Sequence, residues 1–390
     1  MGSLAPGDAV ACAQAMRILH VITTLDVGGA EMHLLSQVRG QAARGAEVRV
    51  VYLKGEGRLT EDFLAAGARH VEHVKPTRAF GLWKHLRWAE IVHSHLLKAD
   101  MLTAPLALLA GRRAHLLSGK HNDEQVLTRW WVGAIHGVVG RLPTRTVVLS
   151  DHVGRFVERY GRIPRSKQVR IYYGLDPAPF EAAVAAGLVQ RNALRAELGI
   201  GSDDIVFTCV ARFAPQKAHD VLLRAFDRAR RESSRTVRLL LVGDDPFGDG
   251  RQRAEALAKE LGLGSSVVFA GIRRDVPALL AASDCFVMAS LWEGLGLVFL
   301  EAMATGLPCL ATDVSAVPEV VLDGETGRLV PPSDPEAMAE AMVELSEDEA
   351  LRSGLGAAGR GRVADRFGLD RMVEETLQLY GRLARKASST

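Results

Sequence analysis

The chain has 390 residues, 48% of them hydrophobic and 24% charged, and carries a formal net charge of +2. That length exceeds what one hydrophobic core normally supports, so the sequence predicts two domains. The composition is ordinary for a soluble globular protein, and the absence of any apolar run of roughly 18 residues argues against a membrane-spanning helix.

The first 16 residues, MGSLAPGDAVACAQAM, lack the basic start and the apolar core of a signal peptide. They are predicted to form a loose tail, and the protein is expected to be cytoplasmic. Cys12 lies in this tail, whereas Cys209, Cys285 and Cys309 lie inside apolar, strand-like runs. Neither a CxxC pair nor a His/Cys cluster at zinc spacing is present, so free buried thiols and no metal site are expected.

Basic and acidic residues are unevenly distributed along the chain. Residues 1–170 contain 24 Lys and Arg and 14 Asp and Glu, whereas the remaining residues contain 24 and 32. A basic half joined to an acidic half indicates that one domain faces an anionic surface or substrate. An incidental drift of charge between two domains explains the same numbers equally well.

Residues 17–175 alternate short β-branched runs with longer amphipathic stretches, which predicts an N-terminal Rossmann-like domain. RILHVITT is a continuous apolar run of the kind that a buried parallel strand shows, and residues 31–45 then carry apolar positions at helical spacing. This βαβ alternation implies a parallel sheet covered on both faces. The predicted strands are residues 17–24, 47–53, 68–74, 90–95, 115–120 and 144–150.

The same pattern restarts in residues 176–368, which predicts a second Rossmann-like domain. Its expected strands are residues 204–212, 238–244, 266–272, 285–290 and 308–312. Residues 369–390 contain a last helix without a strand partner, expected to pack back on the N-terminal domain. The predicted fold is therefore α/β, with two doubly wound domains facing each other across a cleft, where ligands bind at the carboxyl ends of the strands.

The first candidate site is Gly28-Gly29, directly after the first predicted strand. Paired glycines let the backbone approach a ligand closely, and the N-terminus of the following helix favours anions. The stretch is not a GxGxxG fingerprint, and no ribose-reading acid follows at the right distance, so a nicotinamide cofactor is disfavoured. A plain tight turn would account for the two glycines as well.

The second candidate is the loop VARFAPQKAHD, in which Arg212 and Lys217 follow a predicted strand. A guanidinium fork and an ammonium group at one strand end suit a diphosphate. The alternative is a pair of solvated surface cations. The buried run that leads into Arg212 argues for the first interpretation.

The third candidate is SLWEGLGLVFLEAMATG, Ser290 to Gly306, with Glu293 in a loop and Glu301 on the following helix. Gly294 and Gly296 leave backbone N–H groups available at the N-terminus of that helix. A carboxylate can accept two hydrogen bonds from a cis-diol, so the pair suits a ribose and a sugar. The other interpretation is two solvated charges at the ends of a buried strand–turn–helix.

Together these stretches resemble the retaining, GT-B fold glycosyltransferases of family four, the group 1 type. The resemblance rests on EGLGLVFLE before AMATGLPCLATD, on RFAPQKAHDVLLRAF, on IYYGLDPAPF, and on VVLSDHVGRF, GGAE and VPEVVLDGETGRLVPPSDPEAMAEAM. These motifs occur in the family's order and cover nearly all of residues 17–340. At Tyr173, within IYYGLDPAPF, the family often has Asn.

The resemblance implies a role for each matching residue. Arg212 and Lys217 would bind the donor diphosphate, Glu301 the ribose diol and Glu293 the hydroxyls of the donor sugar. The backbone of residues 271–273 would lie beside the base, and Gly28 and Gly29 would close over the phosphate. The implied donor-binding residues are Gly28, Gly29, Arg212, Lys217, Gly271, Ile272, Arg273, Glu293, Gly294, Leu295, Gly296, Leu297 and Glu301.

Three histidines compete for a place near the reacting sugar. The family has a histidine at a strand end in the context LLSGKHND, so His121 is assigned to the catalytic group with Arg212, Lys217 and Glu293. Many relatives have Thr-x-His where this chain has Gly119-Lys120-His121. His93 is interpreted as a structural histidine and His95 as intermediate between the two roles.

The expected activity is retaining transfer of a sugar from a UDP- or GDP-linked donor to a hydroxyl acceptor, without a cofactor and without a divalent metal. A lipid-linked, envelope or exopolysaccharide glycan is the expected acceptor. The alternatives are a soluble small-molecule acceptor and a non-catalytic membrane-surface protein of the same fold. A 2-epimerase would be expected to lack EGLGLVFLE, and a phosphorylase would need a cofactor lysine that is not found.

The expected partners are a nucleotide sugar, the acceptor and an anionic membrane surface at the inner face of the membrane, with no nucleic acid. The membrane contact would use the basic N-terminal half, where aromatic and basic residues alternate. A solvated basic face over buried tryptophans is the competing interpretation. The candidate stretches are residues 83–88, 112–113 and 129–131.

Overall fold

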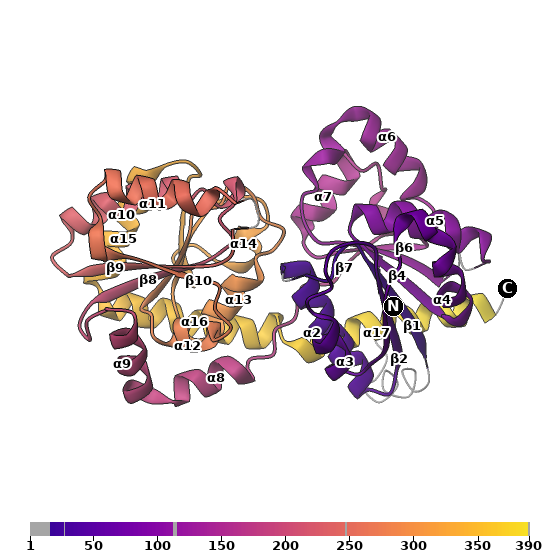
Figure 1. Cartoon of the computed structure of the whole chain (residues 1–390), viewed down its shortest axis with the longest axis horizontal. Helices are drawn as coiled ribbons and strands as arrows, with labels where there is room; N and C mark the ends of the chain where they lie inside the picture. The colour runs from indigo at the N-terminus through magenta and orange to yellow at the C-terminus, as the bar shows by residue number, and fades with distance from the viewer. Residues whose placement is uncertain (1–15, 27, 112–114, 246–247, 389–390) are drawn as a thin grey trace. The chain divides into compact units, whose positions relative to one another are not determined.

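The computed structural model describes residues 16–26, 28–111, 115–245 and 248–388, which form two compact units (Figure 1). The N-terminal unit runs to Gly174 and includes the residues from Phe367 onward, and the C-terminal unit is Leu175–Arg366. The predicted tail, apart from Met16, lies outside the described residues. Met16 itself is buried and belongs to the same core cluster as Ile18 and Ile91.

A parallel seven-stranded sheet forms the centre of the N-terminal unit, in the order β3-β2-β1-β4-β5-β6-β7. Its strands are β1 (Arg17–Ile22), β2 (Glu47–Tyr52), β3 (Ala68–His73), β4 (Ile91–His95), β5 (Leu116–Lys120), β6 (Arg145–Val148) and β7 (Gln168–Arg170). The connection from β1 goes outward to β2 and β3 and then returns to β4. The β1–β4 boundary is thus the topological switch point of this sheet, the place where doubly wound proteins bind ligands.

Helices cover both faces of this sheet. They are α2 (Gly29–Ala43), α3 (Thr60–Ala65), α4 (Trp83–Trp88), α5 (Leu97–Leu109), α6 (Trp130–Val139), α7 (Asp151–Arg159) and α17 (Leu369–Ser388), with 3₁₀ turns at Pro76–Leu82, Gln125–Thr128 and Arg165–Lys167. One core cluster joins strand residues such as Ile18 and Ile91 to α2 and α17, and another joins Leu19 and Val92 to α4 and α5. Because both faces are covered, the inner strands β1, β4 and β5 are buried along almost their whole length, and they carry polar side chains such as His20 and His95 inside the unit.

Helix α17 packs against α2, although more than 300 residues separate them in sequence. At Gly40 a side chain would place its Cβ 2.4 Å from Cγ2 of Val373, so glycine permits the close approach of the two helices. The Arg44 guanidinium donates to Asp370 at 2.7 Å. The final segment is therefore part of the N-terminal unit's core.

In the C-terminal unit, six parallel strands follow the order β10-β9-β8-β11-β12-β13. They are β8 (Ile205–Val210), β9 (Val237–Val242), β10 (Val267–Gly271), β11 (Cys285–Met288), β12 (Cys309–Thr312) and β13 (Gly327–Val330). The connection reverses between β8 and β11, so the switch point of this sheet lies there.

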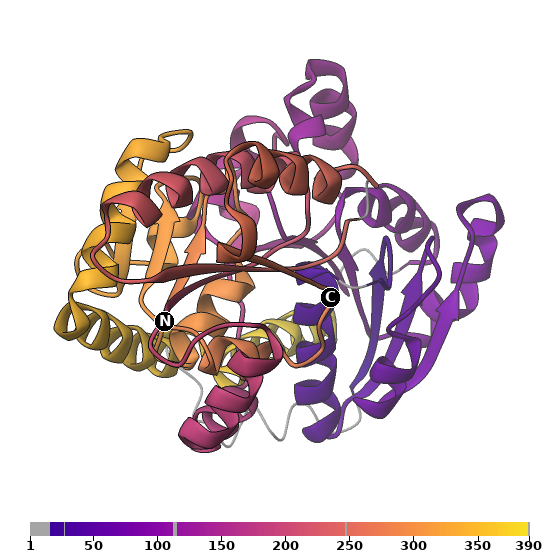
Figure 2. The same ribbon diagram turned by 60° about the vertical axis from the view of Figure 1, so that its left-hand side comes forward.

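The helices of the C-terminal unit form a layer on each face of the sheet. They are α8 (Ala178–Ala185), α9 (Gly187–Glu197), α10 (His219–Glu232), α11 (Gly250–Glu260), α12 (Val276–Ala281), α13 (Leu297–Ala304), α14 (Val317–Val320), α15 (Pro335–Glu347) and α16 (Glu349–Arg366), with 3₁₀ turns at Pro215–Lys217 and Gly264–Ser266. Helices α10, α11 and α15 cover one face, and α12, α13 and α16 cover the other (Figures 1 and 2).

The predicted α/β fold with two doubly wound sheets is confirmed, and every predicted strand is present within one to three residues at its ends. Two strands, β7 and β13, were missed. Both are three or four residues long and lie at the outer edge of their sheet, where QVR and GRLV are partly exposed. Short, half-exposed edge strands lack the apolar run that identifies an interior strand.

Candidate functional site

Two loops meet at the switch point of the C-terminal sheet. The loop after β8 carries Arg212 and Lys217, and the loop after β11 carries Glu293. Backbone N–H of Leu291 donates to the carbonyl oxygen of Gln216 at 2.8 Å, and Gln216 Nε2 donates to the carbonyl oxygen of Trp292 at 2.6 Å. These bonds fix the two loops to each other.

Lys217 and Glu293 form an ion pair across the two loops. The side chains are only 13% and 7% exposed, and Ser290 Oγ donates to Glu293 Oε1 at 2.7 Å. Lys217 is therefore not a solvated surface cation. A buried pair of this kind is costly to break, because either partner alone would be an uncompensated charge. Nearby in β8, burial raises the pKa of the Cys209 thiol to about 12, so it stays protonated.

Arg212 lies between two buried residues, Ala211 and Phe213, yet its own side chain is exposed. Among the described residues its guanidinium has neither a hydrogen-bond nor an ion-pair partner. The fork of five N–H donors is available to a ligand.

Glu301 projects from the second turn of α13 and is partly buried. Within the described part of the chain, its carboxyl group has no hydrogen-bond or ion-pair partner. Desolvation raises the pKa of Glu301 to about 7. A carboxyl group that is withdrawn from water without a donor is less stable as an anion, and a ligand that supplied donors would restore the charged form.

The glycine run between the two glutamates shapes the start of α13. Gly294 and Leu295 are buried, and Gly296 has φ +81°, a conformation that L side chains rarely adopt. A Cβ at Gly296 would lie 2.5 Å from the ring of Phe299. Helix α13 begins at Leu297, and its N-terminal cap is a glycine with no side-chain cap. Phe299 N–H donates to the Gly296 carbonyl oxygen at 3.0 Å, while Leu297 and Val298, at the very start of the helix, have no side-chain cap.

Gly271 ends β10 at the edge of the same sheet, and Ile272 and Arg273 follow it. Gly271 has φ +68°, and Ile272 is 66% exposed. The Arg273 guanidinium donates to Asp275 and to Glu197 at 2.7–2.9 Å, and these carboxylates raise its pKa. The Arg273 side chain is engaged by its neighbours, so only the main chain and Ile272 are open at this point.

In the N-terminal unit, Gly28 precedes α2 and Gly29 is its first residue. Gly28 is extended, with φ −167°, which any residue adopts. A Cβ there would lie 2.6 Å from Glu31 Oε2, because the Glu31 side chain folds back and accepts a hydrogen bond from Thr24 Oγ1 at 2.5 Å. Gly28 thus makes room for Glu31, which the sequence analysis did not single out. Gly29 is exposed, with open space around it.

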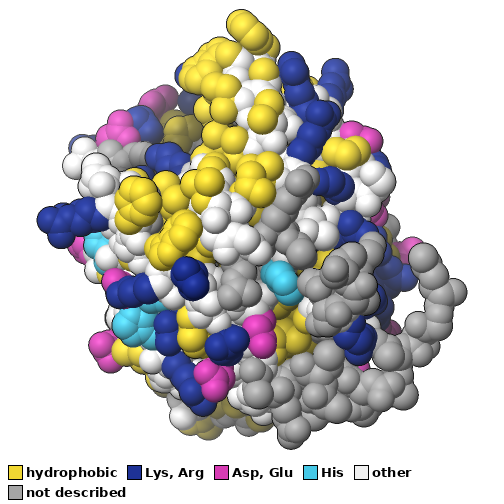
Figure 3. Space-filling view, turned by 90° about the vertical axis from the view of Figure 1, so that its right-hand side faces the viewer, with side chains coloured by type: hydrophobic (Ala, Val, Ile, Leu, Met, Phe, Trp, Pro, Cys, Tyr) yellow, Lys and Arg dark blue, Asp and Glu magenta, His cyan; other side chains and the backbone are white. Residues whose placement is uncertain are grey.

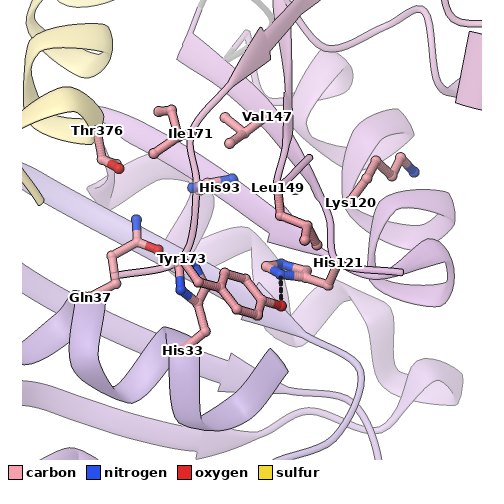
Figure 4. A pocket seen from close by; sticks show the side chains of 11 residues that line it. His33, Gln37, His93, Lys120, His121, Val147, Leu149, Ile171, Tyr173 and Thr376 are labelled. Atoms are coloured by element: carbon pink, nitrogen blue, oxygen red, sulfur yellow. Dashed lines mark hydrogen bonds between the residues drawn. The ribbon is translucent and has the colours of Figure 1, made fainter. Parts of the chain in front are cut away.

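His121 is buried at the end of β5 and belongs to a chain of hydrogen bonds. Gln41 Oε1 to His20 Nε2, His20 Nδ1 to His95 Nε2 and His95 Nδ1 to His121 Nε2 are each 2.9 Å, and His121 Nδ1 to the Tyr173 hydroxyl is 3.0 Å. The residues come from α2, β1, β4, the end of β5 and the segment after β7. Figure 4 shows the Tyr173 end of this chain.

Burial lowers the pKa of every imidazole in this cluster: to about 4 for His20, to about 3 for His121, and well below the ordinary value for His95. The rings are therefore neutral at physiological pH. Beside them lies a cavity about the size of one water molecule, lined on its polar side by His33, His93, His121 and Tyr173 (Figure 4).

Among the described residues, the hydrogen-bonding capacity of His93 is only partly used. Its Nδ1 is 2.6 Å from the Tyr380 hydroxyl on α17, but its Nε2 is buried without a partner among the described residues. A Cβ at Gly119 would lie 3.0 Å from His93 Nε2, His95 Nδ1 and His121 Nε2 alike. Gly119 is thus the point of β5 on which the three rings converge.

Lys120, the neighbour of His121, is buried on the opposite face of the sheet. It forms an ion pair with Asp100, which also accepts hydrogen bonds from Ser94 and Ser118 at 2.6 and 2.8 Å. Lys120 Nζ lies 2.9 Å from His136 Nε2. This cluster, which was not predicted, neutralises its own charge.

Two groups of possible metal-ligating side chains come together only in the tertiary structure. They are His20, His93 and His95, and His70, Glu72 and His85, each with ligand atoms within 4.8 Å of one another. The residues of each group come from two elements that are separated in sequence, so no zinc-type spacing reveals them. Cys209, Cys285 and Cys309 are free and buried, as predicted, while Cys12 lies outside the described residues.

Comparison with solved structures defines the class of the protein. Anabaena HepE, solved in complex with UDP and glucose, has a TM-score of 0.82 with 21% identity over 96% of this chain and all of that one. WaaG, a glycosyltransferase involved in lipopolysaccharide biosynthesis, has a TM-score of 0.69 over 94% of this chain. The two parallel α/β sheets are therefore those of the GT-B glycosyltransferase fold.

Sequence comparison identifies the family. Residues 27–179 match the family model Glycosyltransferase Family 4, and residues 190–362 match Glycosyl transferases group 1. A GDP-mannose-dependent alpha-(1-6)-phosphatidylinositol monomannoside mannosyltransferase of Mycolicibacterium smegmatis is 31% identical over 371 residues, covering 87% of this chain and 91% of that protein. The chain belongs to glycosyltransferase family 4 and is a retaining glycosyltransferase that uses a nucleotide sugar.

A second relative differs in its acceptor. The D-inositol 3-phosphate glycosyltransferase of Salinispora arenicola is 32% identical over 303 residues, which cover 76% of this chain and 64% of that protein. One relative is thus named for a phosphatidylinositol monomannoside and the other for D-inositol 3-phosphate.

Proposed function

We propose that this enzyme transfers a hexosyl group from a nucleoside diphosphate sugar to a hydroxyl of a lipid-linked acceptor, with the donor held by the C-terminal unit. The main support for this donor site is a pair of charged side chains, at the switch point of the C-terminal sheet, whose hydrogen-bonding capacity is not satisfied. In the part of the chain that the structure describes, Arg212 is exposed without a partner, and Glu301 is desolvated without one. A nucleoside diphosphate supplies the complement of both, since its phosphates accept hydrogen bonds and its ribose hydroxyls donate them.

The remaining donor contacts follow from the same loops. Lys217 and the N–H groups at the start of α13 are suited to the diphosphate, because both favour anions. Glu293, held by Ser290 and Lys217, offers its second oxygen to hydroxyls of the donor sugar. Residues 271–273 are proposed to contact the base, and Gly28, Gly29 and His121 remain proposed contributions of the N-terminal unit.

The proposed mechanism does not use a carboxylate side chain as a nucleophile. In a same-face displacement, the bond between the donor phosphate and the sugar breaks with oxocarbenium character. The departing phosphate takes the proton of the acceptor hydroxyl, and the acceptor oxygen bonds to the sugar on the face that the phosphate leaves. Catalysis then consists of positioning and of stabilising the negative charge that develops on the diphosphate. Arg212 and Lys217 are the groups that supply this stabilisation.

A patch of exposed apolar side chains on the N-terminal unit favours a lipid acceptor. Helix α6 exposes Trp130 by 77%, Trp131 by 51% and Val138 by 73%, whereas a solvent-facing helix is normally polar. Figure 3 shows hydrophobic side chains gathered on this face beside Lys and Arg. The patch comprises Leu108, Leu109, Val126, Trp130, Trp131, Ile135 and Val138.

Cations stand at both ends of this helix, Arg129 before it and Arg141 after it, and both are exposed. Aromatic side chains inserted at a lipid interface with arginines at the headgroups are the arrangement of a peripheral membrane helix. Trp83 and Trp88, in contrast, are partly buried, and Arg49 stacks on Trp88 at 3.9 Å. Residues 112–113 lie outside the described residues, and no described helix has the length and hydropathy to cross a bilayer.

A thermal-shift screen of UDP- and GDP-sugars tests the donor site. A ligand at 100 times its dissociation constant stabilises a protein by about 2.7 kcal/mol, so the correct donor should raise the unfolding temperature by several degrees. Transfer from that donor to lipid-linked and soluble acceptors then identifies the acceptor class. No stabilisation by any nucleotide sugar, together with no transfer, would contradict the proposal.

Vesicle co-sedimentation tests the membrane surface. The protein should bind vesicles containing anionic lipid more strongly than zwitterionic vesicles, and Trp130→Ala/Trp131→Ala should lose most of this binding. Leu188→Ala/Val189→Ala is the matched control, since these side chains on the C-terminal unit are 73% and 83% exposed. Transfer to a soluble inositol phosphate without vesicle binding would instead favour the soluble acceptor.

A further inference from the structure

The hydrogen-bond chain Gln41–His20–His95–His121–Tyr173 has a direction. Each neutral imidazole has one nitrogen that donates and one that accepts. His20, His95 and His121 each use both nitrogens within the chain, so the direction of donation is the same at every step. Reversing any one bond would require a second proton on one ring and none on its neighbour.

The Gln41 end sets that direction. With the Gln41 amide oriented so that Oε1 faces His20, His20 Nε2 donates to it, His95 Nε2 donates to His20, and His121 Nε2 donates to His95. Gln41 Nε2 is then buried without a partner among the described residues, so the NMR experiment below also tests this orientation. His121 Nδ1 is then a lone pair, and the Tyr173 hydroxyl donates to it. Burial keeps all three rings neutral, which preserves the chain because an imidazolium donates from both nitrogens.

The Tyr173 hydroxyl is held against His121 by its ring. The ring stacks on His33, with centroids 4.0 Å apart and planes 20° from parallel. Its O–H group has the same donor chemistry as a hydroxyl of a sugar. The adjoining cavity, lined by His121, Tyr173 and His33, is already polar (Figure 4).

We propose that Gln41, His20 and His95 are positioning residues that hold His121 as its Nε2–H tautomer, so that Nδ1 accepts a hydrogen bond from a substrate hydroxyl. The Tyr173 hydroxyl takes the place of that hydroxyl in the free enzyme. This assignment rests on the proposed function only for the identity of the hydroxyl. The tautomer is a property of the protein alone.

Nitrogen NMR of ¹⁵N-histidine-labelled protein reads the tautomer directly, with His121→Gln to assign the resonance. We expect His121 as Nε2–H in the wild-type protein, and still as Nε2–H in Tyr173→Phe, because His95 continues to accept its proton. His95→Leu should release the ring into a mixture of tautomers, and His95→Asn, whose amide oxygen can accept, should restore it. A wild-type His121 in the Nδ1–H form would overturn the proposal, as would a switch to that form in Tyr173→Phe.

Kinetics separate positioning from simple packing. His95→Leu is expected to lower kcat about tenfold with little change in donor KM, and His95→Asn to recover most of the loss. A correctly folded His95→Leu with wild-type kcat and tautomer would overturn the proposal. If the wild-type enzyme showed no transfer with any donor, the proposed function would fail while the NMR result still decided the tautomer.

An alternative arrangement is a metal ion bound by two rings of this chain, His20 and His95, together with His93. Adding Zn²⁺ to EDTA-treated protein distinguishes the two arrangements. We expect the histidine resonances to stay unchanged. Stoichiometric binding that shifts all three would break the His20–His95 bond and would overturn the positioning chain.

Discussion

The two switch points of this enzyme have the same topology but opposite polar character. At β1–β4 the N-terminal unit buries neutral imidazoles that are satisfied mostly by one another. At β8–β11 the C-terminal unit holds charges, of which Arg212 and Glu301 lack partners among the described residues. A neutral network suits the recognition of hydroxyls, whereas unpaired charges require a ligand with charge and donors of its own. The two sheets have similar topology, so the difference in what each unit can bind comes from the loops and the inward-facing side chains.

The largest expected effect concerns charge inside the N-terminal unit. Asp100→Asn leaves Lys120, which is 1% exposed, as an uncompensated buried cation. We expect the free energy of unfolding to fall by about 3–5 kcal/mol in urea titrations followed by tryptophan fluorescence. Asp370→Asn is the control, because its carboxylate is 90% exposed and its pair with Arg44 should contribute under about 1 kcal/mol. Equal losses in the two variants would contradict the contrast between a buried and an exposed pair.

In the C-terminal unit, Arg212→Ala should affect activity and leave stability unchanged. Losing one preorganised donor to the diphosphate is expected to cost about 2.7–4 kcal/mol, or about 10²–10³-fold in kcat. Lys217→Ala is a less clean test, since it also leaves Glu293 buried without its partner. Arg235→Ala, an exposed arginine after α10, provides the matched control. Near-normal turnover in Arg212→Ala would remove this residue from the donor site.

Gly119→Ala tests how tightly the imidazoles converge in the N-terminal unit. The added methyl group would lie 3.0 Å from three ring nitrogens, so the rings must shift, at an expected cost of about 1–3 kcal/mol. Gly361→Ala in α16 meets open space and should be neutral or stabilising by up to about 1 kcal/mol. Thermal unfolding of both variants measures the difference, and a neutral Gly119→Ala would show that the cluster is loose.

Glu301→Gln tests whether the unpaired Glu301 carboxyl group makes the stability of the protein depend on pH. The folded protein raises the pKa of Glu301 from 4.5 to about 7, so the folded state holds a proton that the unfolded chain has lost. Wild-type stability should therefore decrease as pH rises from about 4.5 to about 7, and the variant should lack this decrease. Thermal scans between pH 4.5 and 8 measure it.

The same variant should bind the nucleotide about tenfold more weakly, as expected for loss of a charge-assisted hydrogen bond. Isothermal titration at pH 8 measures this. A variant that bound as tightly as the wild type would place the ribose elsewhere, even if its pH dependence were as expected.

The elements of the fold and the loops of the donor site were predictable because their signals are local. An interior parallel strand is a continuous apolar run. The loop after β8 shows its cations, Arg212 and Lys217, close together in sequence, and the loop after β11 shows Glu293 beside its glycines. The Lys217–Glu293 pair could not be predicted, because 76 residues separate its members and only the pairing of β8 with β11 brings them together.

The histidine chain could not be predicted from the sequence at any of its steps. His93 and His95 share a strand face by their spacing, but Gln41, His20, His121 and Tyr173 reach them from other elements. The sequence by itself determined two doubly wound sheets and the family, and it singled out the loops of the proposed donor site, since apolar periodicity and turn chemistry act over a few residues. Only the tertiary structure decided which polar side chains are satisfied and which wait for a ligand, because burial and hydrogen bonding depend on neighbours that are distant in the chain.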